Sequence, residues 1–173
     1  MSHMPAACLL LLLTTTKLAL AEAPDPWRAV KFLEGSWEAR TVGGSAAAQS
    51  AGSYTFAWEL KGHVLARHGE GPESCQGPTS YDCGHNDLLY VYQEAPGQAL
   101  KAIYFDNEGH VIHYAISTPD PSTAVFLSPA SPHGPQFRLI YQLKDALMSG
   151  KFQVRGPGEA SWKTYLEWSG AKK

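Results

Sequence analysis

Short apolar runs alternate with turn residues along most of the chain, at intervals of about ten residues, as in all-β domains. A single stretch has helical character: Asp25 is suited to cap it, Pro26 to begin it and Gly35 to end it. Its apolar stripe consists of Trp27, Val30, Phe32 and Leu33. The other runs predict about eight to ten strands, in the segments 36–42, 52–60, 63–69, 87–93, 99–105, 110–117, 123–127, 136–142, 147–154 and 161–168.

A sheet of this kind must protect its edge strands, and closure into a barrel removes the edges altogether. A closed sheet of about eight to ten strands leaves room inside for one small ligand, whereas a sandwich fills the space between its sheets with side chains. Composition is compatible with both architectures. We predict a closed antiparallel up-and-down barrel of about eight to ten strands with one short N-terminal helix, and the resemblance described below favours this choice over the sandwich.

Two connections are specific enough to predict a register. Residues 60–63 are short enough for a tight hairpin, and residues 106–109 fit a type I turn with Gly109 in the left-handed conformation. The second turn pairs Phe105 with Val111 and fixes which side chains share a face of the sheet.

The bulk composition excludes some classes of function. The chain has 173 residues, enough for one domain with a full core. Its formal net charge is -2 and only 17% of its residues are charged, with no cluster of Lys and Arg. A nucleic-acid-binding surface needs dense positive charge, so we expect no nucleic-acid partner.

The N-terminus has the pattern of an export signal. Residues 6–13 are apolar, too few to span a bilayer, and Ala19-Leu20-Ala21 is a small-x-small cleavage pattern. This predicts a signal peptide at 1–21, a mature barrel domain at 22–173, and a secreted or periplasmic protein without a stable membrane span. The alternative is a cytosolic protein with an apolar tail, because no Lys or Arg precedes the apolar run.

The cysteines agree with export. Cys8 falls in the signal segment, which leaves Cys75 and Cys83 as a pair in the mature chain. Such a pair commonly closes a disulfide in an oxidising compartment. A metal site that includes His85 is the alternative, but the spacing matches no recognised ligand pattern, so we predict the disulfide and no metal.

A family resemblance rests on residues 32–38, where a short helix runs into Gly35-x-Trp37 at the first strand. This segment resembles the opening of calycin-superfamily barrels such as lipocalins and fatty-acid-binding proteins. Residues 58–65 and 104–111 are similar to bacterial lipocalin-like proteins of unknown function. The resemblance implies that Trp37 packs at the closed end of the barrel beneath a cavity for a small hydrophobic ligand.

Nitrobindins, which bind heme, open in a similar way. The sequence departs from their pattern because no glycine follows Trp37 at the next motif position, and because residues 151–173 contain no His. We therefore predict no cofactor and keep heme, with His113 or His68 as axial ligand, as an alternative.

The predicted hairpin divides its polar residues between two faces, and alternation leaves open which face is inward. If the face of Tyr104, Tyr114, Asp106 and His110 is inward, Asp106 can orient His110 as a general base; the alternative is a pair that merely flanks a turn. If the other face is inward, His113 becomes the candidate base or ligand anchor, and the alternative is a satisfied core histidine.

Aromatic side chains supply the candidate wall of a ligand cavity. The predicted ligand-binding residues are Trp37, Tyr54, Phe56, Trp58, His68, Tyr90, Tyr92 and Tyr114. A carboxylate could be met by Arg67, Arg138 or Arg155 if any of them points inward. A filled core is the alternative for the whole set.

These features support three functional hypotheses. The first is a carrier of a small hydrophobic or amphipathic molecule. The second is an enzyme that uses His113 or His110 as acid or base, Tyr104 as hydrogen-bond donor and Asp106 to orient the imidazole. The third is an envelope protein with a filled barrel, whose loops bind a partner.

Overall fold

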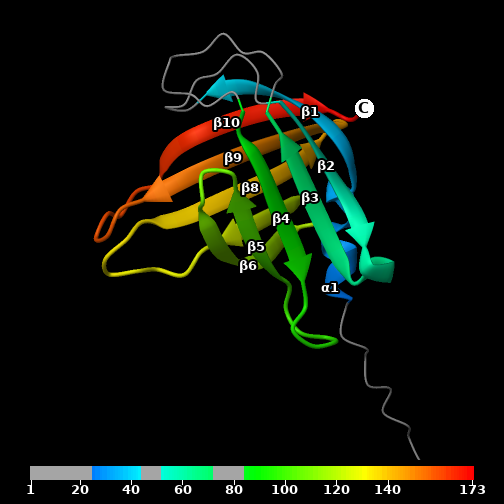
Figure 1. The fold of residues 1–173 in the computed structure, drawn as a ribbon, viewed down its shortest axis with the longest axis horizontal. Helices are drawn as coiled ribbons and strands as arrows, with labels where there is room; N and C mark the ends of the chain where they lie inside the picture. The colour runs from blue at the N-terminus through cyan, green and yellow to red at the C-terminus, as the bar shows by residue number, and fades with distance from the viewer. Residues whose placement is uncertain (1–24, 44–51, 72–83) are drawn as a thin grey trace, which may run out of the picture.

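Ten strands form one closed ring in the computed structural model of the protein, which describes residues 25–43, 52–71 and 84–173 (Figure 1). Each strand pairs antiparallel with the next, and the first pairs back to the last. The strands are β1 (Gly35–Gly43), β2 (Gly52–Glu59), β3 (Val64–Glu70), β4 (Asn86–Tyr92), β5 (Lys101–Asp106), β6 (Val111–Asp120), β7 (Thr123–Leu127), β8 (Gln136–Lys144), β9 (Leu147–Arg155) and β10 (Lys163–Ala171). The predicted fold class is confirmed.

The helix α1 (Pro26–Val30) and a 3-10 turn, η1 (Lys31–Leu33), cover one end of the barrel (Figure 1). The Asp25 carboxylate accepts a hydrogen bond from the Trp27 backbone N–H at 3.0 Å, as expected of an N-cap. The buried Trp37 indole donates to the Leu33 carbonyl at 3.0 Å. Trp37 therefore packs against the helical segment at the end that the resemblance implied.

Both predicted turns form as the sequence indicated. Residues Leu60–Gly62 make a 3-10 turn, η2, between β2 and β3, and Gly109 has a φ of 91° in the β5–β6 turn. Phe105 is paired with Val111. Inward residues of this hairpin include Ala102 and Tyr114, which are buried. The face that carries Tyr104 and Asp106 is therefore the inner one.

Closure depends on small residues where β1 meets β10. Gly170 of β10 lies so close to β1 that a Cβ added there would be 1.3 Å from the Glu38 carbonyl oxygen. Gly150 of β9 likewise leaves space for the indole of Trp168, which a Cβ would meet at 2.1 Å. A side chain at position 170 would force β1 and β10 apart, so the seam requires glycine there, whereas a side chain at position 150 would displace the Trp168 indole.

Aromatic rings occupy the middle of the barrel. We call this group the aromatic core; it consists of Tyr54, Phe56, Tyr114, Phe126, Tyr141 and Trp168, all of them buried. Each ring lies within 6.5 Å of another, centroid to centroid, mostly edge to face. The alternative of a filled core therefore describes the centre of the barrel.

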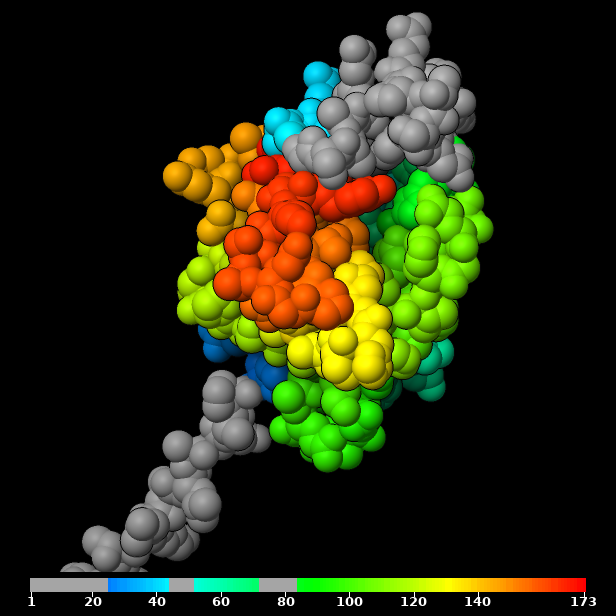
Figure 2. All heavy atoms as spheres, turned by 90° about the vertical axis from the view of Figure 1, so that its left-hand side faces the viewer, coloured from blue at the N-terminus to red at the C-terminus, as the bar shows by residue number. Residues whose placement is uncertain are grey.

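The outer wall carries two of the three arginines considered above. The turns that follow β7 and β9 lie side by side at the surface, yellow and orange to red in Figure 2. The Arg138 and Arg155 guanidinium carbons lie 4.3 and 4.6 Å from the ring centroid of Trp162. Arg67 alone of the three points inward.

In the described segments, no helix has the length and apolarity that a membrane crossing requires.

Candidate functional site

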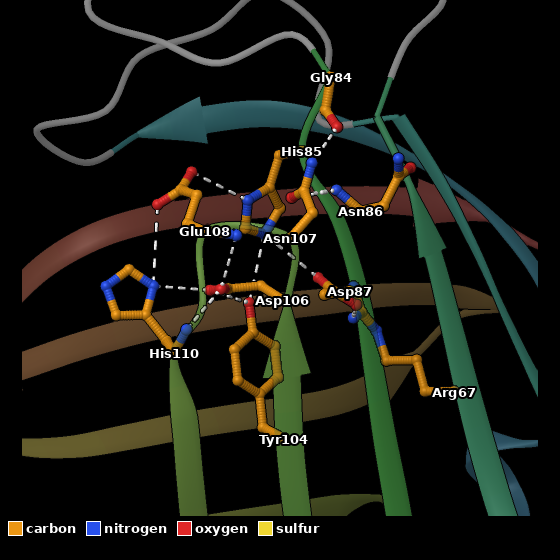
Figure 3. Close-up of polar contacts among 10 residues, drawn as sticks. All are labelled: Arg67, Gly84, His85, Asn86, Asp87, Tyr104, Asp106, Asn107, Glu108 and His110. Carbon is orange, nitrogen blue, oxygen red and sulfur yellow. Dashed lines mark hydrogen bonds and ion pairs between the residues drawn. The ribbon is translucent and has the colours of Figure 1, made fainter.

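Polar side chains gather at the end of the barrel opposite α1, where β3 ends, β4 begins and β5 turns into β6 (Figure 1, Figure 3). We call this group the mouth cluster; it consists of Arg67, His85, Asp87, Tyr104, Asp106, Glu108 and His110. Strand alternation places Asp87 and Asp106 on the inner face, and the register sets them directly opposite each other. Two carboxylates in such positions repel, so the cluster must supply compensating charge.

Asp106 is held by four hydrogen-bond donors. Its Oδ1 accepts from the backbone N–H groups of Glu108 and His110 at 3.0 and 2.8 Å, and its Oδ2 lies 2.8 Å from Nδ1 of His110. The Tyr104 hydroxyl also donates to Oδ2, at 3.3 Å. Burial alone would raise the pKa of Asp106, but the backbone and side-chain hydrogen bonds from His110 outweigh it, and the pKa lies below its usual value.

The Asp106–His110 pair is the one that the sequence analysis considered as a base. The His110 side chain is 63% exposed whereas that of Asp106 is 4% exposed. The carboxylate can thus orient the imidazole, which is open to solvent. Burial, reinforced by the Asp106 charge, raises the pKa of Tyr104, so its hydroxyl stays protonated and acts as a donor.

His85 completes the rim from the start of β4. Its Nδ1 lies 3.2 Å from the Glu108 carboxylate and its Nε2 lies 3.2 Å from the Tyr104 hydroxyl. Nε2 is also 3.6 Å from Asp87. The Asn107 amide holds this arrangement together, because it donates to the Gly84 carbonyl at 2.9 Å (Figure 3).

Arg67 and Asp87 form an ion pair just inside the mouth, with 11% of each side chain exposed. Gly69 makes space for the pair, because a Cβ there would lie 2.4 Å from an Asp87 oxygen and 3.0 Å from Nη1 of Arg67. The Arg67 guanidinium carbon also lies 4.9 Å from the ring centroid of Tyr54. Arg67 therefore joins the mouth cluster to the aromatic core.

A depression of about 650 Å³ opens at this end of the barrel. Its lining includes the inward positions Gly69, Asp87 and Asp106 and the outward positions His68 and Leu88. A smaller hollow of about 390 Å³ lies at the helical end, beside Phe32 and Trp37. The larger depression is of the size that small-molecule sites have, and it lies over the Arg67–Asp87 pair.

In the barrel interior, several buried polar atoms have no hydrogen-bond partner among the described residues. They include Arg67 Nε, the hydroxyls of Tyr54 and Tyr141, and Trp168 Nε1. The Trp168 indole still acts on the Tyr54 hydroxyl, because it opposes the rise in the tyrosine pKa that burial causes. These atoms surround one ring, because the Tyr54 centroid lies 5.9 Å from that of Tyr141 and 6.5 Å from that of Trp168. Buried polar atoms are nearly always satisfied in native proteins, by protein, water or ligand. A hydrogen-bond acceptor that reached this group would satisfy these atoms.

Of the predicted ligand-binding residues, Tyr54, Phe56 and Tyr114 lie in the barrel interior. Trp37 and Trp58 lie at the helical end, where Trp58 donates to Glu34 at 3.1 Å and packs 5.3 Å from Trp27. They support the closed end of the barrel, opposite the mouth cluster along the strands.

Four of the predicted site residues prove to lie on the outer wall. His113 is exposed on β6, and His68 is exposed on β3, where it bonds Glu59 at 3.0 Å. Tyr90 and Tyr92 alternate with the buried Leu89 and Val91 of β4, so they also face outward. The hypotheses that placed these four in a cavity were wrong, because the opposite face of each strand turned inward. Neither His68 nor His113 is positioned to ligate a heme inside the barrel.

The sequence analysis missed some residues of the site, and two predicted residues lie outside the part of the chain that the structure describes. Sequence reasoning considered His85 only beside the cysteines and did not consider Asp87 and Glu108. The 106–109 turn fixed the register between β5 and β6. The sequence did not show that His85, which precedes β4, lies beside Glu108 of that turn. Cys75 and Cys83 fall outside the described residues, so the disulfide stays a prediction.

Asp87→Asn is expected to lower the free energy of unfolding by about 3 kcal/mol, because it leaves the buried guanidinium of Arg67 unpaired. The double variant Arg67→Met/Asp87→Asn should recover much of this loss. Urea unfolding measures both. The matched control is Glu159→Gln, which breaks the exposed pair with Lys163 and should change stability little. Equal losses for Asp87→Asn and Glu159→Gln would contradict this assignment.

Asp106→Asn is expected to lower the free energy of unfolding by about 2 kcal/mol near neutral pH, because charged hydrogen bonds are lost. EDTA is present in this measurement to keep metal ions away from the carboxylate. The folded-state pKa of Asp106 lies below its unfolded value. Its contribution is therefore complete above the unfolded pKa and disappears as the pH falls through the folded pKa. The stability gap between wild type and variant should close in acid; a gap independent of pH would show that the charge is not responsible.

No protein-family model matches the chain, and a search of curated proteins gives no match. The barrel topology and the geometry of the mouth therefore carry the functional argument.

Proposed function

We propose that the protein is a lipocalin-like carrier, which binds a small amphipathic molecule at the end of its barrel that carries the mouth cluster. The observation that carries the proposal is the group of buried polar atoms around Tyr54, of which Arg67 Nε and the Tyr141 hydroxyl have no hydrogen-bond partner among the described residues. Leaving each such group unsatisfied costs about 1–3 kcal/mol. A ligand that brings one or two acceptor atoms to this place would recover part of that cost.

The acceptor is a neutral group such as a ketone, ester or amide carbonyl. Arg67 is already neutralised by Asp87, and Asp106 lies directly opposite Asp87. A carboxylate brought to the same place would add a negative charge, and the described part of the mouth offers no second Arg or Lys to meet it. Burial of an unpaired charge is strongly unfavourable. The charge balance therefore favours a carbonyl over an acid.

Side chains fill the centre of the barrel, so the rings around Tyr54 must repack to admit the acceptor. The apolar part of the ligand would then contact these rings and the walls of the mouth depression. Aromatic faces provide a large apolar contact area, and a few fixed donors orient the bound molecule. The volume of about 650 Å³ limits the ligand to a small molecule.

A binding titration with prodan, a fluorescent naphthyl ketone, tests the proposal. We expect saturable binding with a blue shift of the emission, because the probe leaves water. Tyr141→Phe should weaken the affinity roughly fivefold to tenfold, since one hydrogen bond to the carbonyl is lost. Anilinonaphthalenesulfonate, an anion of similar shape, should bind more weakly than prodan.

Tyr92→Phe is the matched control, because it removes a hydroxyl from the outer wall of the same barrel. It should leave prodan binding unchanged. Equal affinities for Tyr141→Phe, Tyr92→Phe and wild type would show that the probe does not use the buried donors. Absence of saturable binding by both probes would refute the carrier function.

Export is part of the proposal and has its own test. The apolar segment 6–13 and the Ala19-Leu20-Ala21 pattern support cleavage before Glu22. Intact mass spectrometry of protein secreted by a host should give a chain that begins at Glu22, reduced in mass by the hydrogens lost when Cys75 and Cys83 join. An uncleaved chain with free thiols would contradict export and the disulfide.

A further inference from the structure

We propose that the rim of the mouth also binds a divalent transition-metal ion, through His85, Asp106 and Glu108, with His110 as a fourth donor. One ligand atom from each of the first three lies within 4.8 Å of the other two. Nδ1 of His110 lies 2.8 Å from Asp106 and 3.7 Å from Glu108. Two imidazoles and two carboxylates thus converge from β4, β5 and the β5–β6 turn (Figure 3).

Only a small movement would bring these atoms to coordination distance. Around an ion with bonds of about 2.0–2.2 Å, ligand atoms lie about 3–3.5 Å apart. The nitrogen of His85 is already 3.2 Å from Glu108. The Glu108 and His110 side chains are 44% and 63% exposed, so both can turn without disturbing the core. Asp106, fixed by backbone N–H groups, provides the rigid point of the site.

The mouth cluster carries an excess of negative charge, which a cation would balance. Asp87, Asp106 and Glu108 bring three negative charges, and Arg67 brings one positive charge, which leaves two negative charges while the imidazoles are neutral. Asp87 and Asp106 oppose each other directly across β4 and β5. A divalent ion would balance the two negative charges that remain after Arg67 is counted.

Neighbouring groups are placed to orient the ligands. The Tyr104 hydroxyl lies between His85 and Asp106, at 3.2 and 3.3 Å, and Asp87 approaches Nε2 of His85 at 3.6 Å. A carboxylate or hydroxyl that meets the second nitrogen of a ligating imidazole fixes its tautomer and ring orientation. When Nδ1 of His85 binds the ion, Tyr104 and Asp87 can serve in this way.

The mixed nitrogen and oxygen donors favour zinc, cobalt, nickel or manganese over calcium and magnesium, which prefer oxygen alone. Zinc is the probe of choice, and cobalt reports coordination through its visible absorption. The site is distinct from the buried donors around Tyr54, so it goes beyond the carrier function and does not depend on it.

The test is calorimetric titration of zinc into the EDTA-treated and dialysed full chain. We expect one ion per chain, and a visible band on cobalt addition that zinc abolishes. His85→Ala should weaken zinc binding at least about tenfold. Because Asp106→Asn also weakens the turn, His85→Ala is the primary variant, and circular dichroism verifies its fold. Calcium and magnesium should give no saturable heat.

Two controls make the result specific. His113→Ala removes an exposed imidazole from the outer wall of β6 and should leave zinc affinity unchanged. Cys75→Ser/Cys83→Ser removes both sulfur atoms, whether they are joined or reduced, and should also leave zinc affinity unchanged. Zinc binding that survives His85→Ala, or is lost with the cysteines, would overturn the site. Prodan binding by the same samples shows whether the carrier function stands or fails separately.

Discussion

Gly170→Ala is expected to destabilise the protein by at least about 4 kcal/mol, a loss large enough to prevent folding. The added Cβ would lie 1.3 Å from the Glu38 carbonyl oxygen and 3.3 Å from Cα of Ala39. Both contacts are with the backbone of β1, so no side-chain rotation relieves them. The strands must separate, and the pairing that closes the ring is lost.

Gly43→Ala provides the control at the same seam. Gly43 pairs with Glu167 of β10, and among the described residues a Cβ there would meet only the Glu167 side chain, at 3.6 Å or more. Thermal and urea unfolding of the two variants should show a severe loss for Gly170→Ala and little change for Gly43→Ala. If Gly170→Ala is as stable as Gly43→Ala, β1 and β10 do not meet as described.

Alkaline solution is expected to unfold the barrel steeply between about pH 10 and pH 12. Burial raises the pKa of Tyr54 to about 12 and also raises that of Tyr104, Tyr114 and Tyr141. The unfolded chain releases these protons near the ordinary tyrosine pKa, whereas the folded chain retains them. Stability is therefore complete below about pH 10 and falls as the pH rises. Tyr54 alone accounts for about 3 kcal/mol of this loss.

Tyr141→Phe separates the tyrosine effect from the general loss of lysine charge. The variant lacks one of the buried phenols that must ionise, so its stability should fall less between about pH 8 and pH 12 than that of wild type. Tyr165→Phe, at an exposed position of β10, should follow wild type. Parallel curves for wild type and Tyr141→Phe would mean that this phenol is not buried in the folded protein.

Much of the fold could be predicted because local signals agreed with the global one. Asp25 with Pro26 marked the helix start, and the 106–109 turn fixed the pairing of Phe105 with Val111. The regular spacing of apolar runs matched the strands closely. The seam was not predictable, because a glycine in a strand does not reveal which backbone approaches it.

The site was predicted in part, for a physical reason. Both faces of the β5–β6 hairpin are largely apolar, so alternation alone left His113 and His110 equally placed. The structure resolves the choice, since Tyr114 is buried and His113 is exposed. The position of His85 could not be predicted, because its contact with Glu108 depends on the register between β4 and β5, which a long connection before β4 leaves open in the sequence.

The acceptor place beneath the mouth can be observed at single atoms by nuclear magnetic resonance. In nitrogen–proton correlation spectra of the labelled protein, titration with a small ketone should shift the side-chain N–H signals of Trp168 and Arg67 until they saturate. The indole signal of Trp162, which packs on the outer wall between β8 and β10, should stay in place. Signals of Trp168 and Arg67 that do not move at saturating ketone, or that move no more than Trp162, would contradict the ligand site.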